Sequence, residues 1–188
     1  MKILCEVSVK HVHLSEKDFK ALFGENAVCE RVRDLSQPGQ YLSCQKVDLV
    51  GPKRAITGVS VLGPTRSQTQ VELSRSDCFV LGLKDVPVRE SGKLHGTPGI
   101  TIRAGENEVV LSEGVIVMQR HVHMDTKTAG DNGFVDKQIV SLRVGGDRGG
   151  VLHNTIVRVN KDYAPAAHLD SDEGNALNAC GQEVEIIV

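Results

Sequence analysis

Two short histidine pairs are the residues of this sequence whose spacing most directly suggests chemistry. His11 and His13 are separated by one residue, and so are His121 and His123. On a β-strand, residues i and i+2 point to the same face, so both imidazoles of a pair would converge on one point. Neutral imidazole is a common zinc ligand, and catalytic zinc takes three protein ligands and leaves a fourth position open. Each pair therefore predicts two ligands of a metal site.

An internal repeat connects the two pairs. Three segments of the first half recur in the second half in the same order. The first match is Lys10–Leu14 with Arg120–Met124, displaced by 110 positions. The other two are Val47–Arg54 with Val140–Arg148, displaced by 93 to 94, and Glu72–Asp77 with His168–Glu173, displaced by 96. Three matches in one order indicate two related halves. The fall in displacement after the first match predicts about 16 extra residues in the first half, between His13 and Val47.

The repeat also predicts the third ligand of each site, because Glu72 and His168 occupy equivalent positions after a glycine-rich hairpin. The candidate metal sites are therefore His11, His13 and Glu72 in the first half, and His121, His123 and His168 in the second. A single His-x-His on an exposed strand ordinarily binds nothing, and most glutamates are simply solvated. The duplication favours metal binding over that interpretation.

A tight turn upstream of Glu72 ends in an arginine. The turn Gly63–Thr65 precedes Arg66, and a guanidinium makes bidentate contacts with phosphate. Arg66 is therefore a candidate anion-binding residue near the first metal site, with an ordinary surface position as the alternative. Arg89–Gly92 could also bind an anion, but a solvated loop is the default interpretation.

The cysteines do not suggest a further site. Their number is odd, they are widely spaced, and no Cys-x-x-Cys pair occurs among Cys5, Cys29, Cys44, Cys78 and Cys180. A disulfide framework is therefore not expected, which favours the cytoplasm as the compartment. We expect the cysteines to be small core residues.

Composition excludes several classes of protein. The formal net charge is -2, and the chain has four Phe, two Tyr and no Trp. A near-neutral chain with few aromatic residues does not fit a nucleic-acid binder or a protein of anionic membrane surfaces. No apolar run approaches the roughly 20 residues that a membrane span requires.

Short apolar runs between turn signals predict a mainly β protein of the barrel or sandwich class, with brief helices. The expected strands are 46–50, 55–62, 109–111, 115–118 and 139–144. One helix should begin after Ser15 and end before Gly24. A second should follow Asp170 and Glu173. Residues 92–105 are predicted to form an irregular loop, and 145–150 a hairpin turn.

Taken together, these segments resemble the PduL family of phosphotransacylases, also called phosphate propanoyltransferases. The resemblance covers nearly the whole chain and depends on Val7–Leu14, Val61–Arg66, Gln70–Ser74, Pro87–Gly92, Arg120–Met124 and His168–Ala176. Lys10 stands where the family usually has Arg, and Gly174 stands where Ala is usual. Neither departure affects a proposed ligand.

The resemblance implies two small β-barrels related by internal duplication, capped by short α-helices, with the active site between them. In the family the first strand pairs into the barrel of the C-terminal half. Residues 1–9 with 119–188 would therefore form one barrel, and residues 10–118 the other. The resemblance also implies two Zn²⁺ per chain and a homodimer.

The implied reaction is reversible transfer of a short acyl group, acetyl or propanoyl, between coenzyme A (CoA) and inorganic phosphate. Arg66 would bind the phosphate. The resemblance places CoA contacts at Ser8, Leu62, Asn175 and Arg33, the last standing where the family has Lys. Zinc at the first site could hold the CoA sulfur as a thiolate and polarise the thioester, while the second ion could orient phosphate or stabilise the oxyanion. No covalent nucleophile is required, so we expect direct attack in a ternary complex.

Two other functions use the same residues. A dinuclear zinc hydrolase of thioesters or acyl phosphates would activate water, and a non-catalytic metal-binding protein would need no open coordination position. The turn before Arg66 and the extent of the resemblance favour transfer. Only seven residues precede Ser8, so we expect no extension of the kind that targets relatives to bacterial microcompartments, and instead a cytoplasmic enzyme of fermentation.

Overall fold

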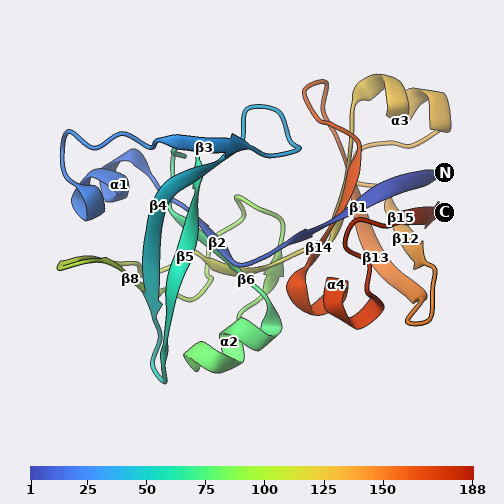
Figure 1. Ribbon diagram of the computed structural model, residues 1–188. Helices are drawn as coiled ribbons and strands as arrows, with labels where there is room; N and C mark the ends of the chain where they lie inside the picture. Colours follow the sequence, from blue (N-terminus) through green and yellow to red (C-terminus); the bar gives the residue numbers. More distant parts are fainter. The chain divides into compact units, whose positions relative to one another are not determined.

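Strands dominate the protein, in agreement with the predicted fold class. The computed structural model describes residues 1–188 and contains fifteen strands and four short helices (Figure 1). The chain divides into two compact units, one made of residues 1–9 and 119–188 and the other of residues 10–118. None of the helices is both long enough and apolar enough to cross a membrane.

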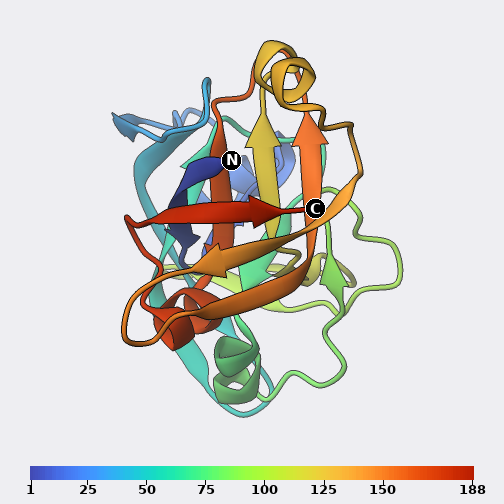
Figure 2. The same cartoon turned by 90° about the vertical axis from the view of Figure 1, so that its right-hand side faces the viewer.

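The first unit is a closed six-stranded barrel. In barrel order its strands are β1 (Lys2–Ser8), β14 (Ala166–Asp170), β11 (His121–Met124), β13 (Gly150–Val159), β12 (Ile139–Val144) and β15 (Glu183–Ile187). The helices α3 (Thr126–Asn132) and α4 (Ser171–Leu177) belong to the same unit. β1 pairs with β15 and closes the barrel, so the strands marked N and C in Figure 2 lie side by side.

The second unit is a nine-stranded sheet that does not close. Along the sheet the strands are β7 (Val88–Arg89), β10 (Val115–Met118), β6 (Gln70–Leu73), β2 (His11–His13), β5 (Ala55–Gly63), β4 (Tyr41–Val50), β8 (Thr101–Ala104) and β9 (Asn107–Val110). β3 (Arg31–Asp34) pairs with β4. The helices of this unit are α1 (Glu16–Phe23) and α2 (Arg75–Leu81).

Both units share one strand order, which supports the internal duplication. The series β10-β6-β2-β5-β4-β8 repeats β1-β14-β11-β13-β12-β15, and all five neighbouring pairs match in being parallel or antiparallel. β1 and β10 are equivalent, since each comes just before a His-x-His strand. However, β1 lies in the unit of the second pair and β10 in that of the first. Each half thus contributes its first strand to the other half's sheet.

In the hairpins that the repeat relates, every second residue of a strand is buried and packs in the core of its unit. In β12, Val140, Leu142 and Val144 are buried, while Ser141 and Arg143 between them are not fully buried. The equivalent hairpin of β4 and β5 buries Val47, Leu49, Val59 and Val61 in the other core. Strands with one buried face show this two-residue period. The predicted strands 46–50, 55–62, 115–118 and 139–144 are confirmed.

The helices begin at side-chain caps that the repeat preserves. The predicted helix α1 is confirmed: Ser15 accepts a hydrogen bond from Asp18 N, and Gly24 is its C-cap. Ser74 with Asp77 and Asp170 with Glu173 form capping boxes at α2 and α4. Two boxes 96 residues apart are a signal for α2 that the sequence analysis missed.

An ion pair that recurs in both halves joins each His-x-His strand to a helix. Lys10 Nζ lies 2.9 Å from Asp77 Oδ1, and Arg120 Nη1 lies 2.8 Å from Glu173 Oε1. In both halves, the basic residue before the histidines therefore pairs with the acidic residue of the capping box. This contact holds the start of the ligand strand against the helix that follows the third ligand.

The structure differs from the sequence analysis in three details. Residues 92–105 are not all irregular, because 101–104 form β8 between β4 and β9. Helix α3 was not anticipated, although Asp125 caps it through Lys127 N and Thr128 N. The second unit has the strand order of the barrel, as expected, but its sheet remains open because β8 and β10 do not pair. The extra residues predicted in the first half include the added strand β3, which has no counterpart in the barrel.

Ser74→Ala should lower the free energy of unfolding by about 1–2 kcal/mol. The side chain is 3% exposed, and its Oγ accepts the hydrogen bond from Asp77 N at 3.2 Å, so alanine leaves that donor unpaired. Urea unfolding monitored by circular dichroism measures the change. Ser112→Ala, at an exposed loop position, is the matched control and should shift stability by less than about 0.5 kcal/mol. Equal midpoints for both variants would contradict the capping role.

Candidate metal centres and their surroundings

The first histidine pair lies in the middle of a three-strand arrangement. β2 pairs with β5 in parallel and with β6 antiparallel, and the register sets His11 opposite Glu72 and His13 opposite Gln70. Nε2 of His11 lies 3.6 Å from Oε2 of Glu72, and the two imidazole centroids are 5.0 Å apart. The ligand atoms of His11, His13 and Glu72 all lie within 4.8 Å of one another. This group could hold a metal ion.

The second pair repeats the arrangement with a third histidine. β11 lies between β13 and β14, and the register sets His121 opposite His168. The ring centroids of His121, His123 and His168 are separated by 4.5, 4.8 and 5.0 Å. Their ligand atoms also lie within 4.8 Å of one another. The equivalence of Glu72 and His168 that the repeat suggested is therefore present in the pairing of the strands.

Burial and mutual repulsion keep the central imidazoles neutral. Burial, together with His121 and His168 nearby, lowers the pKa of His123 to about 2. Burial, with His11 and Arg66 nearby, also holds the pKa of His13 well below its ordinary value. Neutral imidazole offers a lone pair to a cation, so both rings are in the form that binds a metal.

Glu72, unlike His13 and His123, is held in its charged form. Burial alone would raise the pKa of this carboxyl, but the charge and hydrogen bond of His11, with His13 and Arg66, outweigh it and hold the pKa well below its usual range. Glu72 is therefore a carboxylate although it is 5% exposed. A buried carboxylate beside imidazole rings is a suitable oxygen ligand for a divalent ion.

Several ring nitrogens in the two groups have no hydrogen-bond partner, and they indicate whether a cation fits there. Nδ1 of His13 and both ring nitrogens of His123 are buried without a hydrogen-bond partner. Buried polar atoms are almost always paired, so such atoms need an explanation. His121 Nδ1 lies 2.9 Å from the carbonyl of Gln119, a contact that leaves Nε2 for a metal when Nδ1 donates. Both donor sets therefore fit a divalent ion.

The two ligand groups differ in the residues that contact them from outside the ligand set. Glu6 Oε2 lies 3.6 Å from His168 Nδ1, because β1 and β14 place these residues side by side. The ring of Tyr163 packs on His123 with centroids 4.1 Å apart. Sequence reasoning did not identify Glu6 or Tyr163. The internal repeat does not point to either residue. Each lies next to a ligand histidine only in the folded chain.

Arg66 is fixed next to the first group. Its backbone N donates to Leu14 O at 2.9 Å, one residue beyond the His-x-His strand. The preceding Gly63–Pro64 peptide is cis. A Cβ on Gly63 would collide with the ring of Tyr41, so a larger residue at this position requires that ring to move. Arg66 Nη1 donates to Ser91 Oγ at 2.9 Å, which directs the guanidinium toward the loop after β7.

Gln70 and Ser91 are functional candidates that sequence reasoning missed as individual residues. Gln70 is 1% exposed, and its Nε2 donates to Glu72 Oε1 at 2.5 Å and to Ser91 Oγ at 2.8 Å. Both residues lie within the segments that carried the family resemblance. Their contact joins positions 21 residues apart, so periodicity within one element could not have indicated it.

The four residues expected at CoA are divided between the units. Ser8 ends β1, and the exposed Asn175 lies in α4 of the same unit. Arg33 is exposed on β3, within the segment added to the first half, and the half-buried Leu62 lies on β5. Their role remains a prediction.

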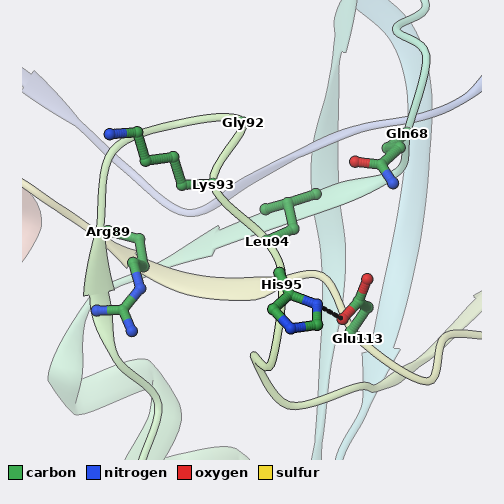
Figure 3. A pocket seen from close by; sticks show the side chains of 7 residues that line it. All are labelled: Gln68, Arg89, Gly92, Lys93, Leu94, His95 and Glu113. Carbon is green, nitrogen blue, oxygen red and sulfur yellow. Dashed lines mark ion pairs between the residues drawn. The ribbon is translucent and has the colours of Figure 1, made fainter.

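An open pocket of about 470 Å³ lies on the second unit (Figure 3). Its lining consists of Gln68, Arg89, Gly92, Lys93, Leu94, His95 and Glu113. Figure 3 shows His95 turned toward Glu113, with Nδ1 and Oε2 4.0 Å apart. Arg89 is exposed and donates to the carbonyl of Val88, while Lys93 pairs with Glu90 at 2.9 Å. The interpretation of residues 89–92 as a solvated loop therefore holds for Arg89 alone, because Glu90 is buried and Ser91 and Gly92 form hydrogen bonds with Arg66 and Gln70.

The cysteines are only partly the core residues expected. Cys5 and Cys78 are buried, but Cys44 and Cys180 are exposed, and all five are free thiols. The prediction was wrong for Cys44, which lies on the outward face of β4, and for Cys180. Burial, with Cys180 and Glu6 nearby, raises the pKa of Cys5 to about 12. Cys5 is therefore a neutral thiol and a poor nucleophile.

Thiol labelling should separate these classes. At about pH 8 roughly 10⁻⁴ of Cys5 is ionised, and the side chain is 0% exposed, so iodoacetamide should label Cys44 and Cys180 and leave Cys5 intact. Mass spectrometry of peptides from native and urea-unfolded protein measures this, and Cys5 should react once the chain is unfolded. Labelling of native Cys5 as fast as Cys180 would contradict the assigned burial and pKa.

Comparison with known proteins agrees with the geometry. A family model described as phosphate propanoyltransferase matches residues 4–180. The phosphate propanoyltransferase of Sebaldella termitidis is 47% identical over 182 residues, which cover 97% of this chain and 84% of that protein. Proteins of the same name from Thermotoga maritima and Listeria monocytogenes are 48% and 45% identical, over 93% and 94% of this chain and 83% and 81% of theirs. The chain belongs to the phosphate propanoyltransferase family.

Proposed function

We propose that the protein catalyses reversible transfer of a short acyl group between CoA and inorganic phosphate. The observation that carries the proposal is the pair of buried ligand groups, one of which has Arg66 beside it, in a chain of this family. Carboxylate and imidazole groups suit a divalent cation, and a guanidinium suits phosphate. The relatives are named for the propanoyl group. Acetyl differs by one methylene, which a pocket distinguishes by only about 1–3 kcal/mol.

We infer that each ligand group holds one divalent ion, with zinc as the proposed metal. When bound, such an ion supplies Lewis-acid polarisation of the thioester carbonyl and stabilises a thiolate leaving group. The chain supplies the remaining functions. His11, His13 and Glu72 form one ligand set and His121, His123 and His168 the other.

Arg66 is the proposed phosphate-binding residue. Its guanidinium can present two parallel N–H donors to phosphate oxygens while Ser91 fixes its direction. In the forward direction, a phosphate oxygen forms a bond to the acyl carbon, the carbon–sulfur bond breaks, and the electron pair leaves with the CoA sulfur. Phosphate held at Arg66 would make this attack intramolecular, which is the main advantage of a ternary complex.

We further propose that the reaction passes through no acyl-enzyme. Neither buried thiol suits a nucleophile, since Cys5 is kept neutral by its pKa and Cys78 packs in the core of the second unit. Both directions then use one ternary complex.

Ser8, Leu62, Arg33 and Asn175 are the proposed contacts to CoA.

A phosphate-dependence assay tests the reaction. Zinc-loaded protein should consume propanoyl-CoA, followed by thioester absorbance, only when phosphate is present, and acyl phosphate should accumulate. Arg66→Ala should lower kcat/KM for phosphate by about 100-fold, because charge-assisted hydrogen bonds to phosphate are lost. Arg103→Ala, an exposed arginine paired with Glu108, is the matched control. Loss of thioester at the same rate without phosphate would identify a hydrolase instead.

Metal counting tests the ligand groups independently of activity. Wild-type protein loaded with zinc and desalted should retain two ions per chain, one for each ligand group, as measured by elemental analysis. His13→Ala and His123→Ala should each retain one, because removal of one of three ligands weakens binding strongly. His153→Ala, an exposed histidine outside both groups, should retain two. A count that does not change in either ligand variant would contradict the proposal.

A further inference from the structure

Gln70 occupies a position where every polar atom of its amide has a partner. Nε2 donates to Glu72 Oε1 at 2.5 Å and to Ser91 Oγ at 2.8 Å, and Oε1 accepts from Gly92 N at 2.6 Å. The side chain is 1% exposed. An uncharged amide so deeply buried and fully paired is fixed in one conformation.

Chemistry fixes the orientation of this amide. Glu72 is a carboxylate and can only accept, so the atom facing it must be the donor Nε2. Gly92 presents a backbone N–H and therefore requires the acceptor Oε1 on the other side. Ser91 Oγ then accepts from both Gln70 Nε2 and Arg66 Nη1. A continuous series of hydrogen bonds runs from Glu72 through Gln70 and Ser91 to Arg66.

The other half of the chain has no such connection. A displacement of 96 relates β5 to β13 and β6 to β14, because His11 pairs with Ser60 and Glu72 while His121 pairs with Ile156 and His168. The same displacement takes Arg66 to Asp162 and Gln70 to Ala166. Neither Asp162 nor Ala166 can play the equivalent part, since one repels anions and the other has no polar side chain. The series is therefore specific to the half that carries the guanidinium.

We propose that Gln70 is a positioning residue for the phosphate acceptor. Through Ser91 it fixes the Arg66 guanidinium relative to the Glu72 carboxylate, and through Gly92 it holds the loop that carries Ser91. This inference rests on the proposed function, in which Arg66 binds phosphate. Loss of the connection should weaken the use of phosphate and leave the use of the acyl thioester nearly unchanged.

Kinetics of two variants test the proposal. Gln70→Met keeps the side-chain length and removes all three hydrogen bonds, and Ser91→Ala cuts the connection at a half-buried loop position. Each should raise KM for phosphate about tenfold, the effect of losing a hydrogen bond to a charged group, while KM for propanoyl-CoA stays within about twofold. Ser91→Thr keeps the hydroxyl and should restore KM for phosphate. Should Gln70→Met fail to fold, the two Ser91 variants still decide.

The matched control is Gln68→Ala, the same residue type two positions earlier, exposed and outside the hydrogen-bonded series. It should behave as wild type in both KM values. An unchanged KM for phosphate in Ser91→Ala, or an equal rise in both KM values, would overturn the proposal, because a merely structural role affects both substrates.

A binding measurement separates this inference from the proposed function. If wild-type protein consumes no acyl-CoA in the presence of phosphate, the proposed function fails, and phosphate stabilisation becomes the readout. Inorganic phosphate should raise the Tm of wild type and Gln68→Ala, and Ser91→Ala should need about tenfold more phosphate for the same rise. Equal phosphate dependence in Ser91→Ala, or no phosphate effect in wild type, would overturn the positioning role.

Discussion

The pairing register of a few short strands determines both ligand groups. A strand turns alternate side chains to one face, so a His-x-His segment delivers two imidazoles together, and the neighbouring strand supplies a third ligand only if its register is correct. His11 faces Glu72 and His121 faces His168. A slip of one residue would bring Val71 opposite His11 and turn the carboxylate to the other side of the sheet. The conserved Lys10–Asp77 and Arg120–Glu173 pairs help to prevent such a slip, since each ties the ligand strand to the helix after the third ligand.

Duplication followed by divergence explains why the two halves share a framework and differ in charge. A divalent ion held by two imidazoles and Glu72 would carry a net charge of about +1, whereas three imidazoles leave about +2. Glu6, near His168, partly offsets that difference from outside the ligand group. Arg66 and the Gln70 series belong to the half with the carboxylate. The proposed anion-binding features are therefore concentrated around the group with the lower net charge.

The parts of this structure that could be predicted are those the repeat or a local pattern determines. The alternating apolar residues of 139–144, the cap at Ser15 and the mainly β fold follow from short-range rules, and the two ligand triplets follow from comparing the halves. The exchange of β1 and β10 between units has no local signal and was implied only by the family resemblance. Glu6 and Tyr163 could not be assigned because their histidine partners are 40 or more residues away, and Gln70 could not because its contacts with Ser91 and Gly92 span 21 and 22 positions. The exposure of Cys44 depends on which face of β4 packs inward, and its isolated position gave no indication of that.

Zinc K-edge X-ray absorption of the metal-loaded protein tests the central claim most directly, since it reports the ligand atoms themselves. Ligation by His11, His13 and Glu72 in one group and by His121, His123 and His168 in the other requires a shell of nitrogen and oxygen only, with the outer-shell pattern of imidazole carbons. The spectrum should lose imidazole scattering in His13→Ala and in His123→Ala. A sulfur scatterer from the cysteines, or a spectrum without imidazole, would contradict the claim that paired strands bring these histidines together to hold metal.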